Sequence, residues 1–479
     1  MTLLPLLLTP TCRRQFLHRL WSVVTSSQQA SLMGCHPTPL IAVLSRGLKM
    51  TQEERQTVAP SLAVFSSLFG YLLVTINDTE FYSSGPEGGQ ARGQQGPASA
   101  WMPFSLAELV PMCLALRDVA LGLVELAFPE SRPAVRGQYR EAVGGEERED
   151  GGEAEVGVWS HLFRAVVAIV RQLHSRDTRR QFCPTNHWIQ PRLSLPLDRP
   201  EGVSFRRSRI RAYRPFRGLR VFTREELESS GPPLSTKEVR LATVLKELPF
   251  TISFGQRVNV FQNLVQRDKQ EHQGDRVNFL QPGGSIDLHV RRDYIYEDAY
   301  DKLSPDNEPN LRMKMRVQLV NVAGLDEAGI DGGGLFREFL NQLLKAAFDP
   351  NRGFFTLTRD QLLYPSHSSG HLTADPSSHY YFIGRMLGKA LYENMLVELP
   401  LASFFLSKLL GQTLLNVDID HLDSLDPELY RNLLYLKTYE GDVQDLGLDF
   451  TVNVDEFGET RCCICTVSKA KKTSVGARS

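Results

Sequence analysis

The sequence predicts a mainly α-helical protein in two parts, an irregular helical region followed by a mostly helical α+β domain. Through most of the first 190 residues, apolar side chains recur at spacings of three and four, which is typical of amphipathic helices. Strict alternation, which is typical of half-buried strands, appears at Ile286–Val290 and Met315–Leu319, and helices and short strands are expected to mix from there to about Val454. Because a chain of 479 residues is too long for one ordinary core, we expect two or three domains.

The bulk composition is that of an ordinary globular protein, with 42% hydrophobic and 23% charged residues and a net charge of −1. The seven cysteines are few and odd in number, which indicates a reducing compartment and no disulfide framework. The N-terminal apolar run is interrupted by Pro5 and has no basic residue before it, so it predicts neither a signal peptide nor a transmembrane segment. We therefore expect a cytoplasmic or nuclear protein without a membrane partner.

Residues 1–190 are predicted to form an irregular stack of helices. Four apolar stripes begin at Phe16, Phe65, Leu109 and Leu162. Ser105 and Glu108 make a capping box at the start of the third stripe. No fixed period relates the stripes, so a regular solenoid is not predicted. Segments 83–99 and 144–157 are rich in glycine and polar residues, and we expect both to be flexible inserts.

Residues 191–233 are predicted to be an arginine-rich linker. Seven arginines lie in Arg206–Arg220, with Phe205, Tyr213 and Phe216 among or beside them. Arginine interleaved with aromatic residues can bind RNA through phosphate contacts and stacking. However, no recognisable nucleic-acid-binding fold surrounds the segment. A solvated linker is therefore the preferred interpretation, and an RNA-associated protein is kept as an alternative.

The second part begins near Leu234 and contains three glycines directly before a helical pattern. Gly332–Gly334 permit a turn that side chains would block, and Phe336 to Ala347 then place apolar residues on one helical face. The Lys-Ser/Thr ending of a phosphate-binding loop is missing, so no phosphate site is predicted. Further on, Gly384 and Gly388 are four residues apart, and we expect them to let another helix approach closely.

The next predicted helix, from Leu401 to Leu410, is expected to pack in the core and to end at Gly411. No pattern of catalytic chemistry is found along the chain: GxSxG, HExxH and paired CxxC motifs are missing. The three histidines between 367 and 379 lack metal-ligand spacing. The residues alone therefore predict no catalytic side chain, no metal and no cofactor.

Four segments of the second part are similar, in order, to the N-terminal lobe of HECT-type ubiquitin ligases. They are RRDYIYEDAYDKL (291–303), GLDEAGIDGGGLFREFL (324–340), LLYP (362–365) and the segment 384–411. The wording ALYENMLVELPLASFFLSKLLG looks closest to the proteasome-associated C-type branch of that family. SRDTRRQFCPTNHW (175–188) also resembles the region ahead of the HECT domain in that branch. The resemblance implies a partial HECT domain at 234–458, incomplete at its C-terminal end.

The resemblance implies a ubiquitin-protein transferase that acts in polyubiquitination and proteasomal degradation. Its expected partners are ubiquitin, a ubiquitin-conjugating enzyme and the proteasome. Members of the family accept ubiquitin as a thioester on their own cysteine, because a thiolate is a strong nucleophile, and pass it to a substrate lysine. That cysteine lies in a C-terminal lobe, for which this sequence leaves no room after Val454. We therefore expect no catalytic cysteine in this chain and no ubiquitin thioester on it.

The cluster Cys462, Cys463 and Cys465 lies where the N-terminal lobe should still be running. No flanking lobe is present to place a thioester near a conjugating enzyme, and the cluster lacks usable metal-ligand spacing. We therefore predict an unrelated or disordered tail at 459–479.

A helix from Asp426 to Leu436 matches part of the surface to which the conjugating enzyme docks in the family. Asp426 is predicted to cap it, and Pro427 fits its first position. One face carries Leu429, Asn432, Leu433 and Leu436. The resemblance implies that this face contacts the conjugating enzyme, whereas ordinary core packing is the alternative. The later helix that completes the groove in the family is missing. A non-catalytic protein that binds or sequesters a conjugating enzyme is therefore an alternative function, and the oligomeric state is not predicted.

Overall fold

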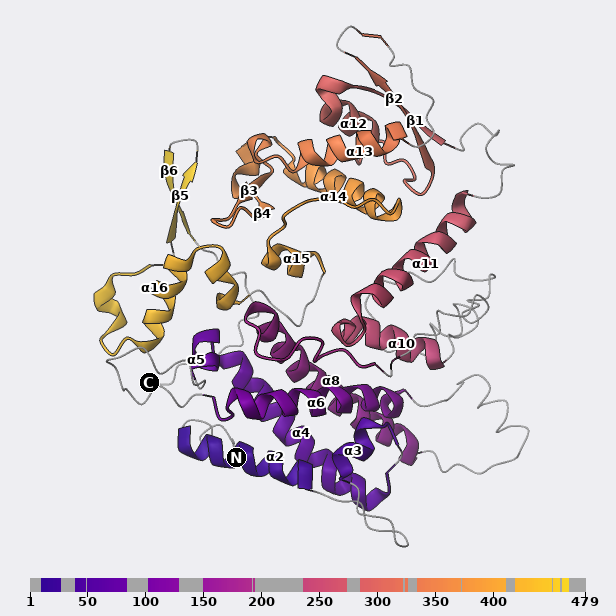
Figure 1. Ribbon diagram of the computed structural model, residues 1–479. Helices are drawn as coiled ribbons and strands as arrows, with labels where there is room; N and C mark the ends of the chain where they lie inside the picture. Colours follow the sequence, from indigo (N-terminus) through magenta and orange to yellow (C-terminus); the bar gives the residue numbers. More distant parts are fainter. Residues whose placement is uncertain are drawn as a thin grey trace, which may run out of the picture. The chain divides into compact units, whose positions relative to one another are not determined.

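The protein divides into two compact units, Met1–Leu264 and Val265–Ser479, which are described separately (Figure 1). The computed structural model describes residues 10–26, 39–48, 50–83, 102–128, 150–191, 193, 236–273, 285–321, 324–325, 334–371, 373–410, 418–449, 451–456 and 459–464. The predicted linker is described only at 191 and 193, and the arginine-rich segment Arg206–Arg220 lies outside the described residues.

Unit 1 is built from helices around one apolar core. Its elements are α2 (Pro10–Ser26), α3 (Leu40–Ser45), α4 (Gln52–Thr75), α5 (Asp78–Tyr82), α6 (Leu106–Ala127), α8 (Asp150–Arg179), α10 (Thr236–Glu247), a 3₁₀ turn (Pro249–Thr251) and the start of α11 (Phe254–Gln273). Helix α8 packs against both α4 and α6. All four predicted stripes contribute buried residues to the core, among them Leu17, Phe65, Leu109 and Leu162. The prediction of an irregular helical region is confirmed.

Local capping fixes where the two central helices begin. Glu108 N–H donates to the Ser105 hydroxyl, and Ser105 N–H donates to the Glu108 carboxylate over 2.8 Å, so the predicted capping box starts α6. Thr51 and Glu54 make the same arrangement at the start of α4. Pro111 lies inside α6 without ending it.

The motif at 175–188 folds around one carboxylate. Asp177 accepts hydrogen bonds from the backbone N–H groups of Phe182 and Cys183 and from Trp188 Nε1, each over 2.8 Å. These bonds close the chain into a loop directly after α8. The motif is therefore an architectural feature of unit 1, because one carboxylate pairs two backbone N–H groups and the indole N–H of the loop that follows α8.

Two boundaries differ from the predicted ones. Helix α8 begins at Asp150, so residues 150–157 of the predicted insert 144–157 are helical, whereas 84–99 and 144–149 lie outside the described part of the chain. Helix α10, which we assigned to the second part, packs on unit 1: Arg171 pairs with Glu247 over 2.9 Å, and Arg240 donates to the Phe128 carbonyl. The compact unit therefore extends beyond residue 234.

Unit 2 mixes helices with short strands. Its elements after α11 are β1 (Ser285–Arg291), α12 (Ile295–Leu303), β2 (Lys314–Val320), α13 (Gly334–Ala347), β3 (Phe355–Leu357), β4 (Leu363–Pro365), α14 (Pro376–Tyr392), α15 (Ser403–Leu409), the 3₁₀ helix η10 (Ile419–Ser424), α16 (Pro427–Thr438), β5 (Thr451–Glu456) and β6 (Glu459–Ile464), with 3₁₀ turns at Arg292–Tyr294, Pro350–Arg352, His367–His371 and Val443–Leu446. The predicted α+β class is confirmed.

The two predicted strands pair in parallel, with Leu288 opposite Val317 and α12 as the connection between them. Their alternate residues are buried, and α13 packs on β2 and α12. Phe339, Leu340 and Leu343 are fully buried on the predicted face of α13. This arrangement is a crossover unit, which a parallel pair requires.

Two packing expectations in unit 2 are wrong. A Cβ atom added at Gly384 or Gly388 would meet nothing within 4 Å, so no helix of the described ranges approaches these glycines closely. Leu409 and Leu410 are 55% and 71% exposed, so the end of α15 is not in the core. The physical reason is common to both cases: the spacing of residues shows which of them share a face, but it does not show that another element covers that face.

A buried ionic network joins the C-terminal turns of α11 and α14. The ammonium of Lys389, which is 3% exposed, contacts Glu393 over 2.6 Å and donates to the Met313 carbonyl over 3.0 Å. Lys269 of α11 contacts the other oxygen of Glu393 over 2.7 Å. Burial raises the pKa of Glu393, but the hydrogen bonds from the two lysines outweigh it and leave that pKa below its ordinary value. Burial lowers the pKa of Lys389.

Among the described helices, only α4 is long and apolar enough to cross a membrane. Phe65, Phe69 and Leu72 of this helix are buried in the core of unit 1. Core helices of globular proteins can have this length and apolar composition, so we assign α4 to the core of unit 1.

Candidate docking site

Helix α16 begins as the sequence predicts. The Asp426 carboxylate accepts hydrogen bonds from the N–H groups of Glu428 and Leu429 over 3.1 and 3.0 Å, and Pro427 occupies the first helical position. Together they satisfy or remove the donors that a helix start leaves unpaired. The helix is therefore well defined at the end that orients Leu429.

One buried hydrogen bond fixes the inward side of α16. Tyr430 is 5% exposed, and its hydroxyl donates to Asp420 Oδ1 in η10 over 3.0 Å. Asp420 is itself 6% exposed, and η10 packs along the helix. Each residue of an α-helix is rotated by about 100° from the one before it. Side chains on the neighbouring face of α16 therefore do not point in the buried direction of Tyr430.

The four predicted docking residues lie on this second face and are largely exposed. Leu429 and Leu433 are 42% and 38% exposed, Asn432 is also exposed, and Leu436 is partly buried. Core packing therefore does not explain Leu429, Asn432 or Leu433. We call this set, Leu429, Asn432, Leu433 and Leu436, the leucine face. Exposed apolar side chains that share a face are typical of surfaces that bind other proteins.

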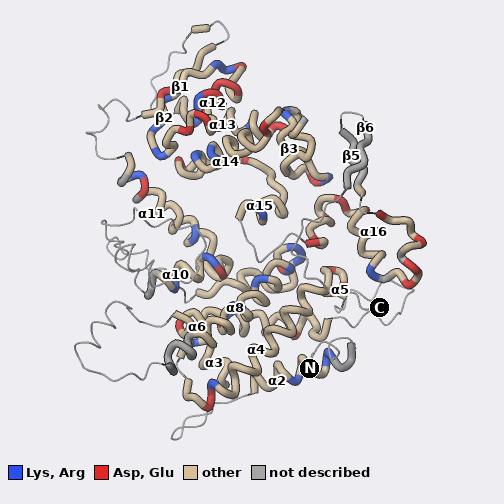
Figure 2. Tube along the Cα trace, turned by 180° about the vertical axis from the view of Figure 1, so that it is seen from behind, with Lys and Arg blue, Asp and Glu red and all other residues tan. Residues whose placement is uncertain are grey.

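The segment around the leucine face is strongly acidic, a feature that sequence reasoning missed. Residues 418–449 contain nine Asp and Glu but only two Lys and Arg, in a chain whose net charge is −1. Four of the exposed carboxylates lie beyond the two ends of the face, Asp423 and Glu428 at one end and Glu440 and Asp445 at the other. Figure 2 shows red gathered around α16, whereas both colours mix elsewhere. Counting charges by segment would have revealed this feature.

The cysteine cluster lies in the last hairpin. Strands β5 and β6 are antiparallel, with Val452 opposite Cys463 and Asn453 opposite Cys462, whereas Cys465 lies outside the described residues. The boundary that we predicted at Gly458 therefore falls in the connection of a hairpin. Residues 459–464, the first six of the predicted unrelated or disordered tail, form β6.

The two cysteines whose side chains are described are both buried in unit 1. A hydrogen bond with the Cys183 thiol, together with burial, raises the pKa of Cys113. A thiol that resists ionisation is a poor nucleophile, so Cys113 has no features of an acyl carrier. Within the described ranges, no group of three His, Cys, Asp or Glu side chains is placed to hold a metal ion.

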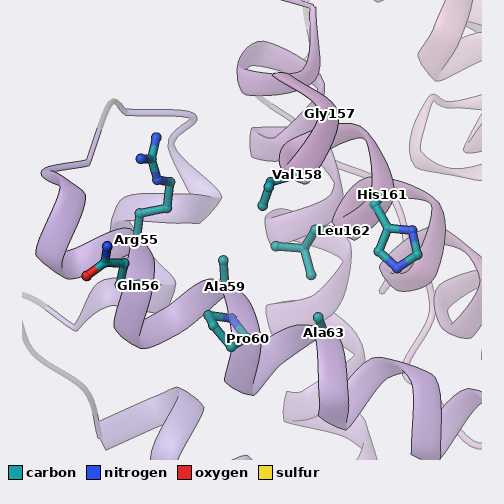
Figure 3. A pocket seen from close by; sticks show the side chains of 9 residues that line it. All are labelled: Arg55, Gln56, Ala59, Pro60, Ala63, Gly157, Val158, His161 and Leu162. Atoms are coloured by element: carbon teal, nitrogen blue, oxygen red, sulfur yellow. The ribbon is translucent and has the colours of Figure 1, made fainter. Parts of the chain in front are cut away.

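Unit 1 has a hollow of about 550 Å³ between the N-terminal parts of α4 and α8 (Figure 3). Ala59, Pro60, Ala63 and Leu162 form its apolar lining, and Arg55, Gln56 and His161 lie at its edge. The lining has no carboxylate, hydroxyl or thiol side chain. The hollow therefore lacks the convergent polar groups of a catalytic site.

The leucine face lies within a recognised domain sequence. Residues 341–477 match the family model described as HECT-domain (ubiquitin-transferase). This match begins inside α13, includes α16 and both strands of the last hairpin, and runs beyond Gly458. Residues 341–477 are therefore HECT-domain sequence, and the chain is a relative of the HECT-type E3 ubiquitin-protein ligases.

Curated relatives agree with this assignment. The chain is 42% identical over 216 residues to E3 ubiquitin-protein ligase UPL6 of Arabidopsis thaliana, which is 45% of this chain and 20% of the relative. It is 33% identical over 374 residues to E3 ubiquitin-protein ligase etc-1 of Caenorhabditis elegans, which is 72% of this chain and 36% of the relative. It is 34% identical over 304 residues to ubiquitin-protein ligase E3B of Mus musculus, covering 63% and 25%. The chain thus spans only about a fifth to somewhat over a third of these relatives.

Proposed function

We propose that this chain contributes the conjugating-enzyme docking part of a HECT-type ubiquitin transferase, and that the leucine face of α16 makes the contact. The observation that carries the proposal is the exposure of Leu429 and Leu433 on a capped, anchored helix inside the matched domain sequence. An apolar anchor on the conjugating enzyme would gain most of its binding energy by covering these two side chains.

Docking serves the transfer chemistry by proximity. A conjugating enzyme carries ubiquitin as a thioester, and the ligase must hold that thioester near an attacking thiolate. The leucine face has no nucleophile, acid or base of its own, so its role is to bind and position. The acyl group would then pass to a cysteine and from there to a substrate lysine.

We further propose that the protein acts in the cytoplasm or nucleus, in polyubiquitination that leads to proteasomal degradation. The seven cysteines of the sequence, few and odd in number, support a reducing compartment. The proteasome link depends on the resemblance of 384–411 and 175–188 to the proteasome-associated branch.

A pull-down with purified ubiquitin-conjugating enzymes tests the docking role. The wild-type chain is expected to retain at least one enzyme of the panel, and Leu433→Ala is expected to weaken retention about tenfold or more. Leu396→Ala is the matched control, because Leu396 is 90% exposed and lies in the same unit but outside the leucine face. Loss of binding in both variants, or in neither, contradicts the proposal.

A non-catalytic protein that sequesters a conjugating enzyme is the second candidate, favoured by a docking face without a described exposed thiol. Incubation with ubiquitin, activating enzyme and conjugating enzyme separates the two. A ubiquitin adduct on this chain that is sensitive to reducing agent excludes pure sequestering and overturns the expectation that the chain carries no ubiquitin thioester. Docking without an adduct supports sequestering. RNA binding through Arg206–Arg220 stays a separate prediction, testable by salt-sensitive binding that is lost when these arginines are replaced.

A further inference from the structure

We infer that the acidic residues around the leucine face select conjugating enzymes whose docking surface is basic. The inference rests on the proposed docking role and adds a determinant of partner choice to it. We call Asp423, Glu428, Glu440 and Asp445 the acidic rim.

The acidic rim is available to a partner. Other carboxylates of the segment are already engaged: Asp420 accepts the Tyr430 hydroxyl, Asp426 caps α16, and Asp442 accepts from the Gln444 N–H. The four rim carboxylates are exposed, and within the described part of the chain none of them forms an ion pair. Their charge is therefore not neutralised internally and contributes to the field outside the surface.

The location of the rim decides which partner it suits. Its carboxylates lie before and after the leucine face along the chain, so a protein whose apolar anchor covers Leu429 and Leu433 would bring its own flanking residues near them. Lysines and arginines at those positions would be attracted, and carboxylates would be repelled. Nucleic acid is repelled by the same field, which makes a basic protein surface the one suitable occupant.

The acidic rim should affect mainly the association rate, whereas the leucine face should affect mainly the dissociation rate. Charges at the edge of an interface change mainly the association rate and its salt dependence, whereas buried anchors change mainly the dissociation rate. Steering by several charges commonly raises association rates by about 10-fold to 1,000-fold at low salt. This difference separates the selection of partners by the rim from the docking role of the leucine face.

The test uses the full chain and the conjugating enzyme best retained in the pull-down, with association and dissociation rates measured by biolayer interferometry at 50 and 300 mM NaCl. One variant replaces the rim by amides: Asp423→Asn, Glu428→Gln, Glu440→Gln and Asp445→Asn. We expect its association rate at 50 mM NaCl to fall about tenfold and its dissociation rate to change less than about threefold. The association rate of this variant should differ little between 50 and 300 mM NaCl.

A second part of the test changes the conjugating enzyme and leaves the chain unchanged. Replacing the lysines and arginines of the enzyme's docking surface by glutamine should lower the association rate of wild-type chain equally, and should have little further effect on the rim variant. Three exposed carboxylates distant in sequence, Asp306→Asn, Asp360→Asn and Glu398→Gln, form the control variant. If the rim variant and its control associate equally fast while Leu433→Ala still weakens binding, the rim inference is overturned and the docking role stands. If no conjugating enzyme binds at all, both are overturned.

Discussion

Helices α8 and α16 carry the same apolar spacing and have opposite surroundings. In α8 the stripe residues Leu162, Val166 and Leu173 are at most 1% exposed, because α4 and α6 pack against this helix. In α16 the stripe residues Leu429 and Leu433 are about two-fifths exposed, and η10 packs on a different side of the helix. A stripe at helical spacing thus shows that a face is apolar, and only the neighbouring elements determine whether it is core or surface.

The contrast also separates an apolar face that explains folding from an apolar face that indicates binding. The buried stripe of α8 explains why unit 1 folds, since burying such side chains is the main favourable term in folding. The exposed stripe of α16 gives the isolated chain no such benefit, and the proposed partner would provide it by covering these side chains. The acidic rim strengthens this difference, because its exposed carboxylates flank the exposed stripe along the chain.

The largest effect is expected from shortening a side chain of the buried stripe. Leu173→Ala should lower the free energy of unfolding of unit 1 by about 3–5 kcal/mol, because it removes buried methyl groups and leaves a cavity. Urea unfolding followed by tryptophan fluorescence measures this effect specifically, since all four tryptophans lie before residue 264.

Leu48→Ala is the control, since Leu48 is 50% exposed in the same unit. A change within about 0.5 kcal/mol is expected for it. Equal destabilisation by both substitutions would show that burial does not distinguish the two positions.

An intermediate effect is expected in unit 2 from removing a charge of the ionic network. Glu393→Gln should destabilise α14 by about 3 kcal/mol, because it leaves the buried ammonium of Lys389 without its carboxylate. Hydrogen exchange of peptides from 376–393, read by mass spectrometry, measures the local effect. Glu398→Gln is the control, because Glu398 is exposed in the same part of the chain.

The same carboxylate predicts a pH dependence. The pKa of Glu393 is below its ordinary value in the folded protein, so its contribution to stability is fully present above the unfolded pKa of about 4.3 and is lost as the pH falls through the folded pKa. Protection of α14 should therefore decrease on acidification below about pH 4.5 in wild type, and less steeply in Glu393→Gln. Identical slopes would show that Glu393 does not contribute.

Local signals in the sequence predicted most of the helices and, in the candidate docking site, the leucine face. The box of Ser105 and Glu108, the cap Asp426 and the alternation in β1 each act within a few residues, so they can be identified without the fold. The open surroundings of Gly384 and Gly388 could not be predicted, because close approach depends on a second helix distant in sequence. The Asp420–Tyr430 bond that orients α16 is also absent from any periodic pattern. The acidic rim was visible in the composition of 418–449 and required only a count.

The smallest effect on stability is expected at the exposed stripe, from the same substitution that has the largest effect in α8. Leu433→Ala should change the stability of α16 by less than about 0.5 kcal/mol, because a leucine that is 38% exposed has few contacts to lose and leaves no closed cavity. Hydrogen exchange of peptides from 427–438 measures this, compared with Tyr430→Ala, which removes the buried anchor of the helix and should increase exchange throughout α16. If Leu433→Ala increases exchange as much as Tyr430→Ala does, the leucine face is part of a core. Its effect on binding a conjugating enzyme would then be a consequence of unfolding. Unchanged exchange together with lost binding shows that Leu433 stabilises a complex and not the fold, which is the difference between α16 and α8.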